Sequence, residues 1–127
     1  MKTSSYTAGA RMAAQLADAK MGEDIVVLDV RHMTGVSDYF VIIGASSGTQ
    51  LSALEGHLAV ELKSHGFRVV REEGHRSDFW KVMDFGGFIV HLIHRDTREF
   101  YGLERLWQGA RHVHWAATKS KRPSRVS

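Results

Sequence analysis

Three aspartates stand near the ends of two apolar segments of the sequence, at Asp24, Asp29 and Asp38. Nucleotidyl transfer with two metal ions requires two or three carboxylates that converge on ions about 3.5–4 Å apart. An Asp-x-Asp pair on one strand would supply two of them, because alternate residues of a strand share a face. The sequence has no such pair, and Asp24 and Asp29 are expected on opposite faces of one strand. We therefore interpret the three as strand-end or capping carboxylates.

A glycine-containing turn, Gly44-Ala-Ser-Ser-Gly48, joins an apolar segment to a helical one, where backbone N–H groups can meet a phosphate. The turn lacks the Lys-Ser/Thr of a P-loop and the spacing of a dinucleotide fingerprint. A plain turn with a serine or threonine helix cap is the commoner structure for such a segment. Nucleotide binding, or a nucleotidyltransferase-like enzyme that uses Gly44–Gly48, therefore stays as the alternative function.

Eight histidines raise the question of a metal site, although the chain has no cysteine to add thiolate ligands. His91 and His94 are three residues apart on one predicted strand and so point to opposite faces. His112 and His114 share a face only if their segment is extended, and they would need a third ligand. We expect no metal and no cofactor.

Trp80 lies in an alternating segment that mixes aromatic and charged residues. Strand periodicity places Trp80, Val82 and Asp84 on one face and Phe79, Lys81, Met83 and Phe85 on the other. Neither face is wholly apolar, which favours a strand near the edge of a sheet. An aromatic residue among charges on such a strand is typical of a protein-binding site, but composition alone favours packing beneath a helix equally.

The spacing of apolar residues predicts the elements that position these groups. Four leucines from Leu51 to Leu62 repeat at three and four residues and indicate an amphipathic helix. Gly86-Gly87 between two apolar segments favours a β-hairpin, and Asp96 with Glu99 resembles a capping box. The predicted helices cover residues 8–20, 49–65 and 96–108, and the predicted strands cover residues 24–30, 39–44, 67–71, 79–85 and 88–94.

This order predicts an α/β fold with a single domain, in which helices flank one mixed sheet of about five strands. The short connection after residue 30 favours an antiparallel pairing of the first two strands. We expect residues 1–110 to form the domain and residues 111–127 to form a basic, flexible tail. Residues 118–127 have almost no apolar content, which is typical of disorder.

The charge of the chain is distributed unevenly along its 127 residues. Residues 1–21 carry +2, residues 22–110 carry −4 and residues 111–127 carry +5. The pI of about 9.4 therefore describes the ends of the chain, and the acidic body is poorly suited to bind phosphates. No apolar run approaches the roughly 20 residues of a membrane span, and the first 20 residues lack the apolar core of a signal peptide. We expect a cytoplasmic protein without membrane contact.

Two stretches of the sequence carry a family resemblance. The first joins residues 22–31 (GEDIVVLDVR) to residues 37–44 (SDYFVIIG). The second comprises Glu73-Gly-His75, residues 80–84, residues 88–94 (FIVHLIH) and residues 97–107 (TREFYGLERLW). Together, over roughly residues 8–108, they closely resemble the ribosomal silencing factor (RsfS, or Iojap) family. The resemblance implies a nucleotidyltransferase-like core without catalytic carboxylates, which agrees with the missing Asp-x-Asp pair.

The resemblance implies a translational repressor that is not an enzyme. Such proteins bind ribosomal protein fourteen of the large ribosomal subunit and sterically block the small subunit from joining. An accessory contact of the basic tail with ribosomal RNA, and a homodimer away from the ribosome, are further expectations. An acidic body suits docking onto a basic ribosomal protein.

The family's contact surface includes a tryptophan that matches Trp80, and an aspartate and an aromatic residue that match Asp84 and Phe85. We group Met83, which lies between them, with these partner-binding residues. Four more positions match the family and are expected to be structural supports: Asp38, Tyr39, His91 and Tyr101. Gly87 departs from the family, which often has an acidic residue there, and this change is expected to weaken one polar contact.

Overall fold

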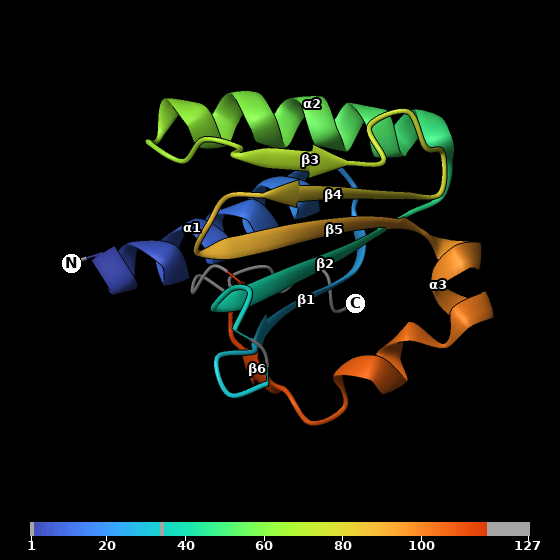
Figure 1. Ribbon diagram of the computed structural model, residues 1–127. Coiled ribbons are helices and arrows are strands. Elements are labelled where there is room, and N and C mark those ends of the chain that lie inside the picture. The colour runs from blue at the N-terminus through green and yellow to red at the C-terminus, as the bar shows by residue number, and fades with distance from the viewer. Residues whose placement is uncertain (1, 34, 117–127) are drawn as a thin grey trace, which may run out of the picture.

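A mixed sheet of six strands runs through the domain (Figure 1). The computed structural model describes residues 2–33 and 35–116, with side chains described from Tyr6 onward. The strands, in the spatial order β3-β4-β5-β2-β1-β6, are β1 (Glu23–Asp29), β2 (Tyr39–Ala45), β3 (Arg71–Glu73), β4 (Trp80–Asp84), β5 (Phe88–His94) and β6 (Arg111–Val113). The helices are α1 (Lys2–Ala19), α2 (Gly48–Ser64), α3 (Arg95–Tyr101) and the 3₁₀ helix η1 (Leu103–Trp107).

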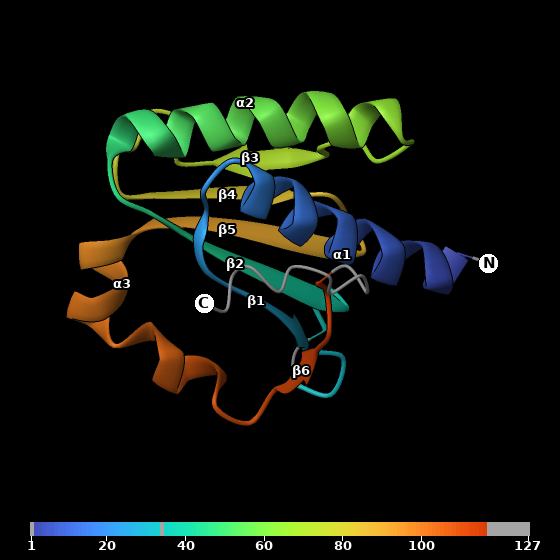
Figure 2. The same cartoon turned by 180° about the vertical axis from the view of Figure 1, so that it is seen from behind.

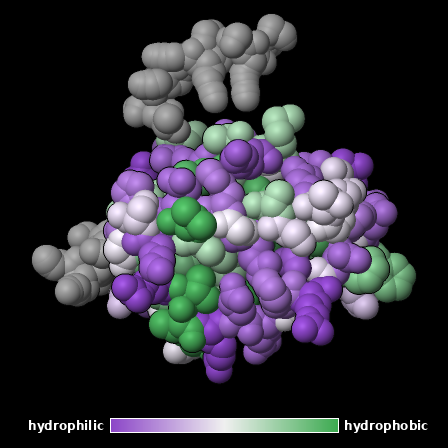
Figure 3. All heavy atoms as spheres, turned by 90° about the horizontal axis from the view of Figure 1, so that it is seen from above, coloured by the Kyte–Doolittle hydropathy of each residue, from purple (hydrophilic) through white to green (hydrophobic). Residues whose placement is uncertain are grey.

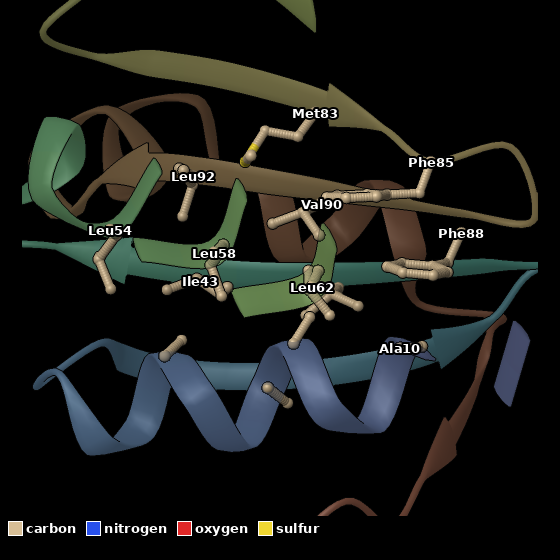
Figure 4. Close-up of a cluster of buried hydrophobic side chains, with 14 of the residues drawn as sticks. Ala10, Ile43, Leu54, Leu58, Leu62, Met83, Phe85, Phe88, Val90 and Leu92 are labelled. Atoms are coloured by element: carbon tan, nitrogen blue, oxygen red, sulfur yellow. The ribbon is translucent and has the colours of Figure 1, made fainter. Parts of the chain in front are cut away.

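Helices α1 and α2 cover one face of the sheet (Figure 2). The four leucines of α2 are fully buried, as their helical spacing predicts, and four alanines of α1 are buried as well. These residues meet the side chains of β2, β4 and β5 that point to the same face (Figure 4). The small alanine side chains let α1 approach closely, and a Cβ at Gly9 would lie only 2.5 Å from the ring of Phe88.

The pairing of the strands confirms the mixed sheet. Strands β1 and β2 form the predicted antiparallel pair, and β4 and β5 form the predicted hairpin. Gly86 lies in that turn with a φ of +93°, a conformation that glycine adopts without steric cost. Strand β2 pairs in parallel with β5, so the chain crosses from one to the other by way of α2, β3 and β4.

The larger differences from the sequence prediction concern α1, β3 and the third helix. Helix α1 begins at Lys2 and not at residue 8. Strand β3 begins at Arg71, which pairs with Asp84, the last residue of β4, and the preceding Val70 N–H donates to the Asp84 carbonyl at 2.8 Å. The capping residue of α3 is His94, whose Nδ1 accepts from the Asp96 N–H at 3.1 Å. Gly102, with a φ of +57°, then separates α3 from η1, so the third helix is two elements.

The sixth strand lies within the segment that we expected to be tail. Residues 111–113 pair with residues 27–29 of β1 as β6, and Trp115 Nε1 donates to the Ile25 carbonyl at 3.3 Å. Backbone pairing to an otherwise open edge of β1 supplies the stability that the weak apolar pattern did not reveal. The predicted disorder of residues 118–127 lies outside the described residues.

The second face of the sheet is only partly covered. Helix η1 and its flanking turns pack Leu103 and Ala110 against Leu28, Val30 and Ile42 near β1.

Seen from above, the α2 side is largely polar with one strip of apolar side chains (Figure 3). Among the described residues, no helix has the length and apolar character that crossing a membrane requires.

Candidate protein-binding face

Strand β4 separates its side chains between the two faces of the sheet. Lys81, Met83 and the adjoining Phe85 are 1%, 0% and 7% exposed, and all three point toward the helices. Trp80, Val82 and Asp84 are partly exposed on the other face. Met83 and Phe85 belong to the main hydrophobic core, so of the four predicted partner-binding residues it is Trp80 and Asp84 that present side-chain surface on the open face.

An aromatic cluster holds Trp80 on the uncovered face. The Trp80 indole Nε1 donates to Nδ1 of His91 at 3.2 Å, and the two rings lie 6.2 Å apart. His91 also meets the rings of Phe40 at 5.0 Å and Trp107 at 6.1 Å. Burial lowers the pKa of His91 to about 4, so at neutral pH its uncharged ring accepts the indole N–H. The hydrogen bond from Trp80 to His91 thus orients the indole ring.

A hollow of about 280 Å³ lies beside this cluster. Phe40, Val82, Ile89 and His91 line it, and the charged side chains of Arg71, Glu73 and Asp84 stand around them. The Oδ1 of Asp84 accepts from the Gly86 N–H at 2.8 Å, while its Oδ2 lies 3.8 Å from the Arg71 guanidinium. An apolar floor with a charged rim is the composition of a protein-binding surface.

Two of the expected supports, Tyr39 and Asp38, lie where β2 begins. The hydroxyl of Tyr39 accepts from Thr7 Oγ1 of α1 at 2.8 Å, and its ring carries the Arg31 guanidinium 5.5 Å from its centroid. The backbone of Asp38 bonds to Gly87 and Val30. Both residues therefore tie the β1–β2 connection to the rest of the sheet.

The fourth expected support, Tyr101, has a different environment. Its side chain is 63% exposed, and its ring contacts the neighbouring exposed ring of Phe100 edge to face at 4.9 Å. Because Gly102 ends α3 directly after it, Tyr101 points into solvent. It supports nothing in the interior.

Gly87 is required by packing. A Cβ at this position would lie 2.1 Å from the ring of Tyr6 on α1. An acidic side chain at residue 87 would therefore displace Tyr6. Where the family often has an acidic side chain at this position, this chain has Gly87, and the ring of Tyr6 fills the space beside it.

Asp24 and Asp29 are too far apart on β1 to share a two-ion metal site. Asp29 pairs with Arg31 at 2.7 Å, and the hydrogen bond from Arg31 holds the pKa of Asp29 at about 2. Asp24 and Asp29 lie five residues apart on β1, a separation of about 16 Å along a strand. They cannot converge on one pair of ions.

The Gly44–Gly48 turn is filled by the protein's own side chains. Ser47 caps α2 by accepting from the Gln50 N–H at 3.1 Å, and Gln50 Oε1 accepts from the Ser46 N–H at 2.7 Å. A Cβ at Gly48 would lie 2.6 Å from the carboxylate of Asp78, so this negative group already lies against the N-terminus of α2. A phosphate would meet an occupied and repelling site, which removes the main support for the nucleotide-binding alternative.

A cluster of charged groups between α2 and β4, in which Glu55 and Lys81 are buried and the other members are exposed, was not anticipated from the sequence. Glu55, Glu72 and His75 bring potential ligand atoms within 4.8 Å of one another. The ammonium of Lys81, however, lies 3.8 Å from Glu55 and donates to the His75 carbonyl. Lys81 supplies the positive charge of this cluster, so the groups form an internal network between α2 and β4. The sequence signal for this network was Glu55, a charged residue that lies among the buried leucines of α2.

Comparisons with known proteins agree with this architecture. The family model described as "Ribosomal silencing factor during starvation" matches residues 3–127. The ribosomal silencing factor RsfS of Haemophilus influenzae is 42% identical over 90 residues, which are 71% of this chain and 88% of the relative. The RsfS of Bacillus subtilis is 35% identical over 100 residues, which are 79% of this chain and 85% of that protein.

A solved structure extends the agreement to the fold. A crystal structure of a protein from Chromobacterium violaceum superposes with a TM-score of 0.74 at 29% identity, covering 92% of this chain and 94% of the other. The same sheet and helices are therefore shared along nearly the whole length of both chains. By sequence and by fold, the chain belongs to the ribosomal silencing factor family.

Proposed function

We propose that this protein represses translation by binding the large ribosomal subunit through ribosomal protein fourteen, so that the bound protein sterically prevents the small subunit from joining. The family to which the chain belongs supports ribosome silencing as the activity. The observation that carries the proposal is the uncovered sheet face, where Trp80 is partly exposed and held by His91. Silencing by occlusion requires no catalytic group.

The chemistry of this face suits a basic protein partner. Trp80 supplies a large, oriented aromatic side chain, which is the residue type that most often dominates binding energy. The hollow beside it can receive an apolar side chain of the partner, and Glu73 and Asp84 can meet basic groups at the rim. The net charge of −4 on residues 22–110 would increase the rate of encounter with a basic ribosomal protein.

The test compares subunit joining with and without Trp80. Purified subunits are mixed with the protein and separated on a sucrose gradient, and binding to isolated large subunits is measured in parallel. Wild type is expected to reduce the joined-ribosome peak. Trp80→Ala is expected to lose about 2 kcal/mol of binding, a factor of about thirty, and to leave joining unimpaired.

Phe79→Ala is the matched control, because Phe79 is a neighbouring aromatic residue that is 61% exposed and contacts His94 outside the Trp80 cluster. It is expected to silence like wild type. The proposal fails if wild type leaves joining unchanged, or if Trp80→Ala, shown to be folded by its circular dichroism spectrum, silences as well as Phe79→Ala does.

A further inference from the structure

Two adjoining hollows lie near the β1 side of the sheet, outside the Trp80 hollow. Their volumes are about 550 and 280 Å³. Figure 1 shows the path of the chain on this side, which leaves β5 through α3 and η1 and crosses to β6 at the far edge of the sheet. Asp24, Arg98 and Glu104 line both hollows. The combined volume is in the range of small-molecule sites.

Arg98 is the unusual residue of this site. It is 7% exposed, and its Nε donates to Glu104 at 2.7 Å, but its buried Nη1 has no hydrogen-bond partner. It lies beside β2, where a Cβ added at Gly44 would be 3.4 Å from Nη1. A buried donor without an acceptor costs free energy. A ligand that brings an acceptor atom to Arg98 would recover it.

The backbone beside Arg98 is also irregular. The register of β1 against β2 shifts between Glu23 and Val26, and Asp24 within that bulge has a φ of +44°. A non-glycine residue with a positive φ stores backbone strain, and such residues cluster at functional sites. The bulge places Asp24 at the wall of both hollows.

The charges of the site exclude a ligand that is recognised by its phosphates. Glu23 pairs with Arg95 at 2.8 Å, and Glu104 pairs with Arg98. Asp24 and Glu99 add two further carboxylates to the lining. Four carboxylates therefore face two guanidinium groups, and the site favours a neutral ligand with hydrogen-bond donors.

The wall of the larger hollow favours a flat ring. Trp107 lines it together with the apolar side chains of Val26 and Leu28. Aromatic side chains bind unstacked bases by stacking, at about 1–3 kcal/mol per base. A planar heterocycle with a carbonyl acceptor for an arginine and N–H donors for a carboxylate is the edge of a guanine base.

We propose that these hollows form a binding site for a guanine base, in which Trp107 stacks on the ring, Arg98 donates to the carbonyl edge and Asp24 accepts from the ring N–H groups. The ligand is recognised by its base and not by its phosphates. The residues that line these hollows differ from those that line the hollow beside Trp80, and the two sites meet where the ring of Trp107 contacts His91. Guanosine binding can therefore be measured whether or not the open face binds the ribosome.

The experiment follows the three tryptophan indole N–H signals by NMR while guanosine is added to the full-length protein. Trp107→Phe assigns the Trp107 signal. The Trp80 and Trp115 signals are expected to move less, because Trp80 reaches Trp107 only through His91 and Trp115 bonds to the backbone of Ile25. The titration of the Trp107 signal is expected to give a dissociation constant for guanosine that is at least tenfold lower than those for adenosine and cytidine. GTP is expected to bind at least fivefold more weakly than guanosine, because its phosphates approach the carboxylates.

Asp24→Asn tests the recognition itself. Asparagine also tolerates a positive φ, so this variant keeps the backbone and replaces one acceptor by a donor, and guanosine affinity should fall about tenfold. Asp18→Asn on α1, which lines neither hollow, is the control and should bind as wild type does. An unmoved Trp107 signal, equal binding of the nucleosides, tighter binding of GTP than of guanosine, or an unchanged affinity of Asp24→Asn would each overturn the proposal.

A final arm identifies the source of the base. A short RNA hairpin with one unpaired guanosine in its loop is compared with the same hairpin in which that guanosine is paired. Tighter binding of the unpaired hairpin than of free guanosine supports the site as one for an extruded RNA base. Weaker binding of both hairpins than of guanosine supports a free nucleoside as the ligand.

Discussion

The two faces of the sheet are made by the same strands and differ in what covers them. On the helix-covered face, residues such as Val41, Met83 and Leu92 have no exposed surface. On the other face, Phe40 and Trp80 keep part of their surface in contact with solvent. Strand β4 shows the difference within five residues, because its odd-numbered positions are core and its even-numbered positions are surface.

This difference teaches that similar side chains serve stability on one face and recognition on the other. Apolar groups that are buried on folding stabilise the domain by roughly 25 cal/mol per Å². An aromatic surface that remains exposed leaves this free energy for a partner to gain. The predictions below separate the two contributions, so that each face can be perturbed without the other.

The largest expected effect is on the helix-covered face. Met83→Ala removes a fully buried side chain and is expected to lower the free energy of unfolding by about 2–5 kcal/mol. Val82→Ala, its neighbour on the open face, is expected to cost less than about 1.5 kcal/mol, because Val82 is only partly buried. Urea unfolding followed by circular dichroism measures both. Equal losses in the two variants would contradict the division of β4 into a core side and a surface side.

The next effect belongs to the open face and depends on pH. Burial lowers the pKa of His91 from 6.5 to about 4, so between these values the unfolded chain binds more protons than the folded protein does. The free energy of unfolding therefore falls as the pH drops through this window, by about 3 kcal/mol at pH 4, and the slope due to His91 fades above about pH 7.5, where the unfolded chain no longer holds the proton.

His91→Phe is the control for this slope, since phenylalanine fills the aromatic cluster without titrating. The variant should lose the pH dependence between 6.5 and 4 in urea unfolding. Asp29, whose pKa is lowered from 3.8 to about 2 by Arg31, contributes stability that is lost only as the pH falls below about 4. A slope that persists in His91→Phe would show that another group causes it.

The fold was predictable where one periodicity dominates. The leucines of α2 and the glycine pair at Gly86 determined a helix and a hairpin, because both are local signals. The sixth strand was missed because residues 111–113 are paired through backbone groups to β1, and backbone pairing leaves no side-chain pattern. His94 was missed as the cap of α3 because the capping atom is a ring nitrogen, which is outside the usual set of capping residues.

The site was predictable only in part, because contacts between residues far apart in the sequence leave no local pattern. Alternation placed Trp80 and Asp84 together, and the structure agrees. Phe85 was grouped with them from the family resemblance and Met83 because it lies between them in the sequence. Alternation places both on the opposite face, where the structure buries them. Phe40 and Trp107 join Trp80 only through the order of strands and the path of η1, which sequence spacing does not reveal.

The smallest expected effect is on the charge at the rim of the open face. Asp84→Asn keeps an oxygen that can accept from the Gly86 N–H, and it removes an ion pair with Arg71 whose side chain is 68% exposed. The free energy of unfolding should therefore change by less than about 1 kcal/mol.

If the acidic face meets a basic partner, the loss of the Asp84 charge should slow association with the large subunit by a few-fold at low salt. It should also reduce the salt dependence of the association rate, while the dissociation rate changes little. Stopped-flow or surface plasmon resonance at two salt concentrations measures this, with Asp18→Asn on α1 as a control of equal charge. Equal slowing in both variants would mean that the net charge of the molecule, and not the rim beside Trp80, steers the encounter.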